Sequence, residues 1–147
     1  MSIQRLRYPA KEGGSKVIVI SLVNSSNVTI IPQSMNWTFS DLNGNIINER
    51  NNIDYEVDSG FGSGGSLSAS MGIILNGQDF LLNNKVGGKL CLLTVEGTYD
   101  SSYGTGLPFK DQCSFVVDNL ISIREYKITL EEGTFWLDGG ATNFTEA

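Results

Sequence analysis

Residues 34–45 read SMNWTFSDLNGN, and apolar side chains alternate with polar ones over the first seven positions. The apolar members are Met35, Trp37 and Phe39. Because successive side chains of a strand point to opposite faces, this run is typical of a half-buried strand. Asn43 and Gly44 then favour the positive φ angles of a tight turn, so we predict a hairpin that returns through residues 46–47.

Strand-like runs continue on both sides of this hairpin. They cover residues 16–22, 27–31, 53–57, 67–75, 88–99, 109–117, 120–130 and 134–137. Residues 88–99 carry apolar side chains on both faces, which indicates a central strand. Short strands at regular spacing predict an all-β fold, a two-sheet antiparallel sandwich of Ig-like architecture. The immunoglobulin order of Cys, Trp and Cys is absent because Trp37 precedes both cysteines.

The connections between these runs are rich in Gly and polar residues. Residues 59–66 lack an apolar face, so we predict a flexible surface loop there. Residues 100–108 predict a second polar loop, and residues 79–84 predict one irregular or helical turn. The last two strands are expected to form a hairpin that closes at residues 131–133.

The length of 147 residues fits one domain with one hydrophobic core. With 40% hydrophobic and 18% charged residues, the composition lies in the globular range. We divide the chain into a basic N-terminal arm (residues 1–15), the β-sandwich (16–123) and a C-terminal hairpin with an acidic tail (124–147).

The charge pattern excludes some classes of partner. A net charge of −6 disfavours binding to nucleic acid, because the phosphate backbone repels an acidic surface. The apolar runs are strand-sized and too short to span a membrane. The first sixteen residues carry four basic side chains without an apolar segment behind them, so no secretory signal peptide is expected.

The sequence contains no histidine, and this argues against an enzyme. Its absence removes Ser–His and Cys–His nucleophile pairs and most zinc sites, so we expect no catalytic residues, metal or cofactor. Asp54, Glu56 and Asp58 remain an alternative as glycosidase carboxylates, against a solvated strand face. Cys91 and Cys113 match no metal or redox motif and are expected to be buried thiols, although a disulfide stays open.

Two binding alternatives remain. Asp41, Asn43 and Asn45 imitate the first half of a calcium loop, but Asn52 stands where that loop needs Glu, so a turn is favoured. The loop from residue 100 onward is a second calcium candidate. Aromatic residues are candidates for a sugar-stacking platform, against a core or interface role. They are Tyr99, Tyr103, Tyr126, Phe135 and Trp136.

Residues 16–123 resemble the immunoglobulin-like β-sandwich modules of tailed-bacteriophage structural proteins. The likeness lies in the Trp-bearing strand that runs into an Asp-x-Asn-Gly turn, and in VEGTYD at residues 95–100, followed by a Gly-rich loop and FVV at 115–117. The sequence departs from that pattern in two ways, because it has no tandem repeats and residues 124–147 have no counterpart.

The resemblance implies a non-enzymatic virion structural protein, made in the host cytoplasm. Its expected role is a capsid decoration (cement) protein or a neck or tail component that packs against other virion proteins and forms a homo-oligomer. The alternative is a carbohydrate- or receptor-binding module that uses the loops at residues 59–66 and 100–108. Neither reading involves nucleic acid or a membrane. Candidate interaction residues are Arg5, Arg7, Lys11, Tyr103, Tyr126, Phe135 and Trp136.

Overall fold

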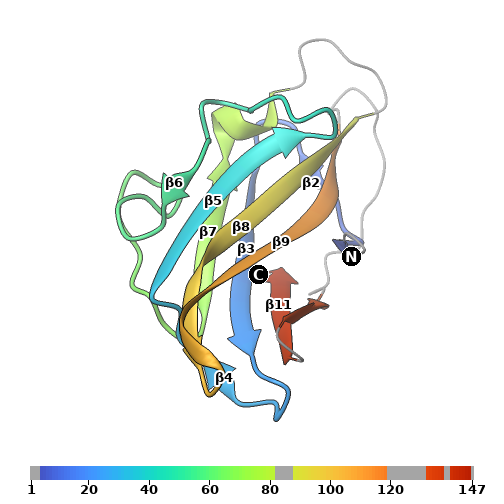
Figure 1. Cartoon of the computed structure of the whole chain (residues 1–147). Coiled ribbons are helices and arrows are strands. Elements are labelled where there is room, and N and C mark those ends of the chain that lie inside the picture. Colours follow the sequence, from blue (N-terminus) through green and yellow to red (C-terminus); the bar gives the residue numbers. More distant parts are fainter. Residues whose placement is uncertain (1–3, 82–87, 119–131, 138–139, 147) are drawn as a thin grey trace.

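The computed structural model describes residues 4–81, 88–118, 132–137 and 140–146, with side chains placed in the first two ranges. These residues form two packed β-sheets, which confirms the predicted all-β sandwich (Figure 1). Within these ranges no helix has the length and apolar character needed to cross a bilayer.

The first sheet has six strands in the order β1–β9–β8–β5–β6, with β2 also paired to β9. They are β1 (Gln4–Arg5), β2 (Ala10–Lys11), β5 (Ser34–Asp41), β6 (Ile53–Asp54), β8 (Lys89–Ser101) and β9 (Gly104–Asp118). β1 and β2 run parallel to β9, and the other pairs are antiparallel. β8 lies between β5 and β9, as its two apolar faces predicted.

The second sheet is built around β3 (Ser15–Val23). Its other strands are β4 (Thr29–Ile30), β7 (Met71–Asn76), β10 (Glu132–Leu137) and β11 (Gly140–Glu146). β7 and then β4 pair along one edge of β3, and β11 pairs along the other edge. A short 3-10 helix, η1 (Gly77–Phe80), follows β7 in the region where an irregular turn was predicted.

The strand order is that of an immunoglobulin-like sandwich. β9, β8, β5 and β6 are neighbours in the order of strands G, F, C and C′, and β3 lies beside β7 as strand B lies beside strand E. β11 occupies the position beside β3 that strand A takes in an immunoglobulin sheet. The C-terminal segment therefore completes the second sheet.

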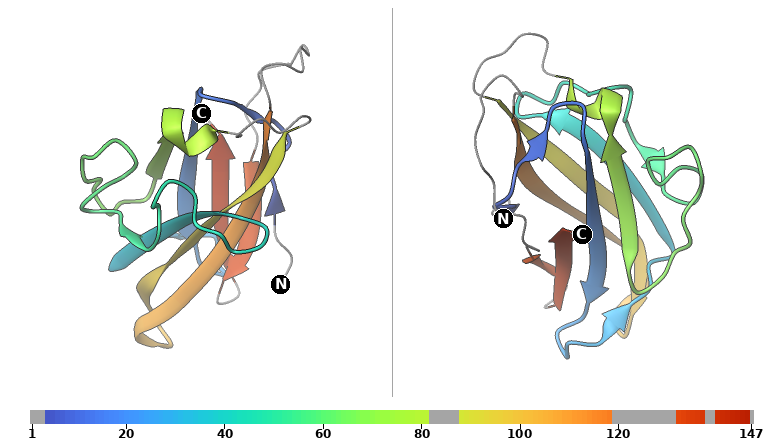
Figure 2. Two further views of the ribbon diagram at one scale, coloured as in Figure 1. Left: turned by 90° about the horizontal axis from the view of Figure 1, so that it is seen from above. Right: turned by 180° about the vertical axis from the view of Figure 1, so that it is seen from behind.

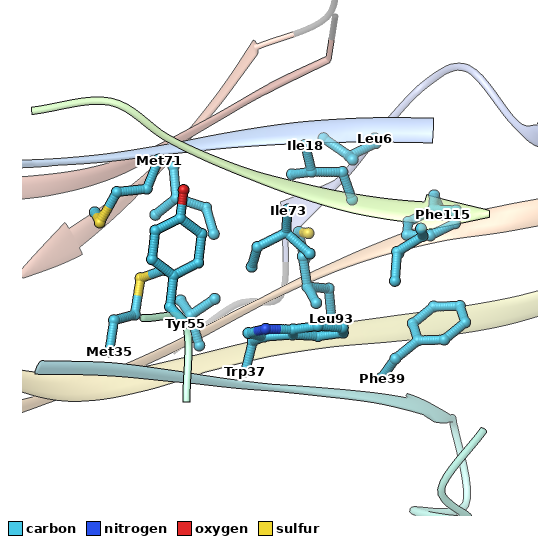
Figure 3. Close-up of a cluster of buried hydrophobic side chains, with 14 of the residues drawn as sticks. Leu6, Ile18, Met35, Trp37, Phe39, Tyr55, Met71, Ile73, Leu93 and Phe115 are labelled. Atoms are coloured by element: carbon cyan, nitrogen blue, oxygen red, sulfur yellow. The ribbon is translucent and has the colours of Figure 1, made fainter. Parts of the chain in front are cut away.

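The core lies between the two sheets and is lined by inward residues of β2, β3, β5, β7, β8 and β9 (Figure 3). Met35, Trp37 and Phe39 are at most 1% exposed, which confirms the half-buried strand predicted from their alternation. Phe39 stacks on Phe115 with ring centroids 5.8 Å apart, and Phe80 from η1 meets both rings edge-on. Such aromatic clusters combine a large buried apolar area with favourable ring geometry.

Three predicted elements differ from the structure. The strand predicted at residues 53–57 ends at Asp54, because the chain turns there and Val57 points into solvent. The loop predicted at 100–108 is mostly strand, since β8 and β9 pair up to Ser101 and Gly104. The hairpin at Asn43-Gly44 forms its turn, but the returning chain makes only one bridge, between Ser40 and Ile46.

The C-terminal hairpin also differs from its prediction. β10 pairs with β11, so the partner of residues 134–137 follows them in sequence instead of preceding them. The predicted strand at 120–130 and its closing turn up to residue 131 lie outside the described residues. At the other end of the chain, β1 and β2 pair with β9, so these parts of the predicted basic arm belong to the first sheet.

Candidate functional site

The candidate interaction residues fall in different places. Arg5 and Lys11 lie on β1 and β2, Arg7 lies between these strands, and all three are exposed. Tyr103 lies at the tip of the β8–β9 hairpin, at the opposite end of β9 from β2. Tyr126 lies outside the described residues. Phe135 and Trp136 belong to β10, and their side chains lie outside the described part.

The tip of the β8–β9 hairpin is well supplied with hydrogen bonds. Asp100 accepts from the Gly106 amide through Oδ1 (2.8 Å) and from the Gln33 side chain through Oδ2 (2.8 Å). The Tyr103 amide donates to Ser101 Oγ (3.1 Å). The carboxylate of Asp100 therefore supports the turn, whereas the calcium alternative would need it as a metal ligand. Tyr103 is 82% exposed at the tip.

Two further apolar side chains lie at the same end of the sandwich. Val28 and Ile31 flank β4 and are 57% and 58% exposed. The chain after β4 is tied to the hairpin, because the Gln33 amide donates to the Thr98 carbonyl (2.8 Å), and Figure 1 shows β4 beside the hairpin tip. We call Val28, Ile31 and Tyr103 the end patch. The sequence did not indicate that Val28 and Ile31 are exposed, because both fall within the strand-like run at residues 27–31, which predicts burial.

A second exposed apolar pair lies on the loop of residues 55–65. Val57 and Phe61 are each 68% exposed, and we call them the loop patch. The loop lies alongside β7 when the molecule is seen from behind (Figure 2), and the Ile74 amide donates to the Ser59 carbonyl (2.9 Å). Residues 59–66 form a surface loop, as predicted, and this hydrogen bond attaches the loop to β7.

Glycine makes the close approach between this loop and β7 possible. A Cβ on Gly60 would lie 1.9 Å from the Ile74 carbonyl oxygen, and the φ of Gly60 is +116°, which other residues rarely adopt. Asp58 fixes the same turn, since its Oδ1 accepts from the amides of Gly60 (2.7 Å) and Gly62 (2.8 Å). Gly60 therefore serves close packing here, whereas nothing lies within 4 Å of a Cβ placed on Gly62.

A buried ion pair anchors the loop to the sandwich. Asp79 of η1 is 2% exposed, and its Oδ1 accepts from Arg50 Nε (2.9 Å) and from the Asn48 side chain (2.9 Å). Its Oδ2 accepts from the backbone amide of Asn76 (2.9 Å) and, at 3.4 Å, from Arg50 Nη2. The carboxylate is therefore fully engaged in hydrogen bonds, which a buried charge requires.

Arg50 joins this carboxylate to the loop. Its Nη2 donates to the Gly60 carbonyl (3.1 Å), and its Nη1 lies 3.4 Å from Asp58 Oδ2. The hydrogen bond with Asp79, reinforced by the nearby Asp58 charge, raises the pKa of Arg50 above its ordinary value. The guanidinium also lies over the Trp37 ring, 5.5 Å from the centroid. Arg50 therefore links η1, the loop and the core strand β5.

The proposed glycosidase carboxylates do not share one strand face. β6 ends at Asp54, whose Oδ1 accepts from the Glu56 amide (3.0 Å), and Asp58 is engaged with Arg50 and the glycine amides. In the part of the chain with placed side chains, no group of three or more His, Cys, Asp or Glu residues could hold a metal ion.

The Asp41 turn matches its prediction. Asp41 Oδ1 accepts from the amides of Asn43 and Asn45 (both 2.9 Å), and Oδ2 accepts from the Asn45 side chain (3.0 Å). The hydrogen bonds from Asn45 lower the pKa of Asp41 below its ordinary value. The carboxylate is therefore occupied by hydrogen bonds within the turn, whereas the calcium alternative would need it as a metal ligand.

Cys91 and Cys113 are both buried thiols that form no disulfide, as expected. Cys113 lies opposite Leu93 and Cys91 lies opposite Phe115, so the two cysteines are not partners across β8 and β9. The pKa of Cys91 is raised to about 11, chiefly by burial of the thiol. The nearby Lys89 charge lowers the pKa, but by less. Because the thiolate is the nucleophile, this thiol is unreactive near neutral pH.

Comparison with known proteins finds no match for this chain among protein-family models, curated proteins or solved structures.

Proposed function

We propose that this protein is a non-enzymatic structural protein of a tailed-phage virion, a capsid decoration (cement) protein or a neck or tail component that acts by packing against other proteins. The assignment to a virion rests on the resemblance of residues 16–123 to the sandwich modules of such particles. The immunoglobulin-like strand order supports it, because it is the architecture that the resemblance implies.

The observation that carries the proposal is the end patch. Tyr103 is 82% exposed at the tip of a hairpin whose turn is held by Asp100, and it lies at the same end of the sandwich as Val28 and Ile31. Exposed apolar groups held by an ordered backbone are suited to protein contact, because little conformational freedom is lost on binding. Tyrosine is also enriched among residues that dominate binding energy.

Adding the full chain back to particles of the source virus from which it has been removed tests this proposal. Wild type should bind the particles, and Tyr103→Ala should weaken binding by about tenfold or more, as expected for a central aromatic contact. Ser102→Ala, which changes an exposed neighbour on the same turn, is the matched control and should bind normally. Absence of this chain from purified particles would contradict the proposal.

The second candidate is a carbohydrate- or receptor-binding module. It is favoured by the same Tyr103 ring, because an exposed aromatic face beside polar groups can stack on a sugar. A glycan array separates the two functions. Saturable sugar binding that is lost in Tyr103→Ala would support the module, whereas binding to particles without sugar binding supports the structural role.

A further inference from the structure

The loop patch and the N-terminal strands lie on opposite edges of the first sheet. β6, which leads into the loop, pairs with β5 at one edge, and β1 and β2 pair with β9 at the other. Figure 1 and the rear view in Figure 2 place the loop and the strands β1 and β2 on opposite sides of the molecule. One copy of the chain can therefore present the two edges to two different neighbours.

The loop patch is apolar, fixed in position and flanked in sequence by exposed acidic side chains. Val57 and Phe61 are each 68% exposed on a loop held by Arg50 and by the bond between Ile74 and Ser59. Three exposed acidic residues belong to the segment of residues 49–61, which includes the loop patch: Glu49, Asp54 and Glu56. Arg50 is the basic residue of this segment, and its charge is already engaged by Asp79 and Asp58.

The opposite edge carries the complementary charge. Arg5, Arg7 and Lys11 are exposed along β1, β2 and the turn between them. Tyr8 and Pro9 are half-buried in the same turn, and the Arg7 guanidinium lies 5.8 Å from the centroid of the Tyr8 ring. This edge therefore offers apolar surface bordered by positive charge.

We propose that the loop patch of one copy docks on the N-terminal edge, residues 5–11, of a second copy. Pairing of like edges would place equal charges together, so charge complementarity selects head-to-tail contact. A contact between two different surfaces repeats from copy to copy and generates a ring or a filament. The inference uses surfaces other than the end patch, so it stands or falls separately from the proposed function.

Charge reversal of the full-length chain tests the inference by sedimentation velocity. Wild type should self-associate as its concentration rises from micromolar to millimolar, and less so at high salt. Arg5→Glu with Lys11→Glu, and separately Glu49→Lys with Glu56→Lys, should each weaken self-association by about tenfold or more. An equimolar mixture of the two variants should associate again, because each then offers the edge that the other lacks.

Two results would overturn the inference: a wild-type chain that stays monomeric at millimolar concentration and low salt, or association that both reversals leave unchanged. Circular dichroism and thermal melting of each variant show whether it is folded.

A zero-length carbodiimide cross-link between Lys11 and Glu56 provides a test on the unaltered chain. In a mixture of isotopically light and heavy protein the link should join light to heavy chains, and links confined to single chains would reject head-to-tail contact.

Phe61→Ala separates the apolar part of the contact from its charges. Phe61 is exposed, so its loss should leave the melting temperature nearly unchanged while weakening self-association by about tenfold. Leu42→Ala removes an apolar side chain that is 55% exposed on another turn and serves as the control. Equal loss of association in both variants would contradict a specific role of the loop patch.

Discussion

Two glycine-rich segments, residues 59–66 and 100–108, are held in place by different means. Backbone pairing between β8 and β9 continues almost to the turn of the second segment, so neighbouring residues largely determine its path. The first segment relies on groups that are distant in sequence, above all Arg50, Asp79 and the amide of Ile74. Similar composition therefore gives one locally determined hairpin tip and one loop that depends on tertiary contacts.

Of the substitutions that test this difference, Asp79→Ala should lower the stability of the protein most. It leaves the Arg50 charge without its main partner and removes the acceptor for Asn48 and the Asn76 amide. Breaking a buried pair from one side should lower the free energy of unfolding by about 3 kcal/mol, measured by urea denaturation. Asp100→Ala at the hairpin tip is the control, and an equal loss in both variants would show that the two segments do not differ.

Gly60→Ala should be the next most damaging change. Its Cβ would meet the Ile74 carbonyl oxygen at 1.9 Å in a backbone conformation that alanine rarely adopts. We expect a loss of about 2 kcal/mol in the free energy of unfolding, measured by thermal and urea unfolding.

Gly106→Ala is the matched substitution in the other segment. Gly106 has a φ of +64°, but nothing lies within 4 Å of the position of its Cβ. The expected loss is about 1 kcal/mol, from backbone conformation alone. The comparison fails if Gly106→Ala proves as costly as Gly60→Ala.

Asp100→Asn should have a smaller effect that is confined to the hairpin tip. The substitution weakens exposed hydrogen bonds to Gly106 and Gln33, and each such bond contributes about 1 kcal/mol at most. Amide hydrogen exchange should rise at Gly106 and stay unchanged at Ile74. A rise at both sites would mean that the hairpin tip and the loop unfold together.

The smallest effect is a change in how stability depends on pH. It involves the Asp41 turn, which is held by local hydrogen bonds, as the hairpin tip is. The folded-state pKa of Asp41 is lowered, chiefly by the Asn45 hydrogen bonds, so this group stabilises the fold above its unfolded pKa. That stability is lost as the pH falls below about 4, through the folded pKa. The free energy of unfolding of Asp41→Asn should therefore decrease less than that of wild type as the pH is lowered. An unchanged dependence on pH would contradict this role of Asp41.

Local patterns were enough to predict the centre of the fold. Alternation alone placed Met35, Trp37 and Phe39 in the core, and apolar residues on both faces marked β8 as central. These signals succeed because a strand with one buried face imposes a period of two on its own residues. The C-terminal hairpin was predicted at the wrong turn. The dipeptide Asp138-Gly139, a strong hairpin signal, lies between the two strands that pair.

The candidate surfaces were less predictable. Arg50 and Asp79 are separated by 29 positions, and neither residue type nor spacing indicates that they pair. Tyr103 was a candidate because an aromatic residue in a polar loop tends to be exposed. Val57 carried the opposite signal, because it falls in the run at residues 53–57 that predicts a strand, whereas the strand ends at Asp54. Phe61 lies in the polar loop predicted at residues 59–66, but it was not among the candidate residues.

Amide hydrogen exchange of the full-length wild-type chain tests the central claim most directly, namely that residues 55–65 form a fixed platform. The amides of Gly60 and Gly62, bonded to Asp58, and of Ile74, bonded to Ser59, should exchange far more slowly than exposed amides of the same sequence. Exchange of these amides at the rate of an unstructured chain would contradict the account.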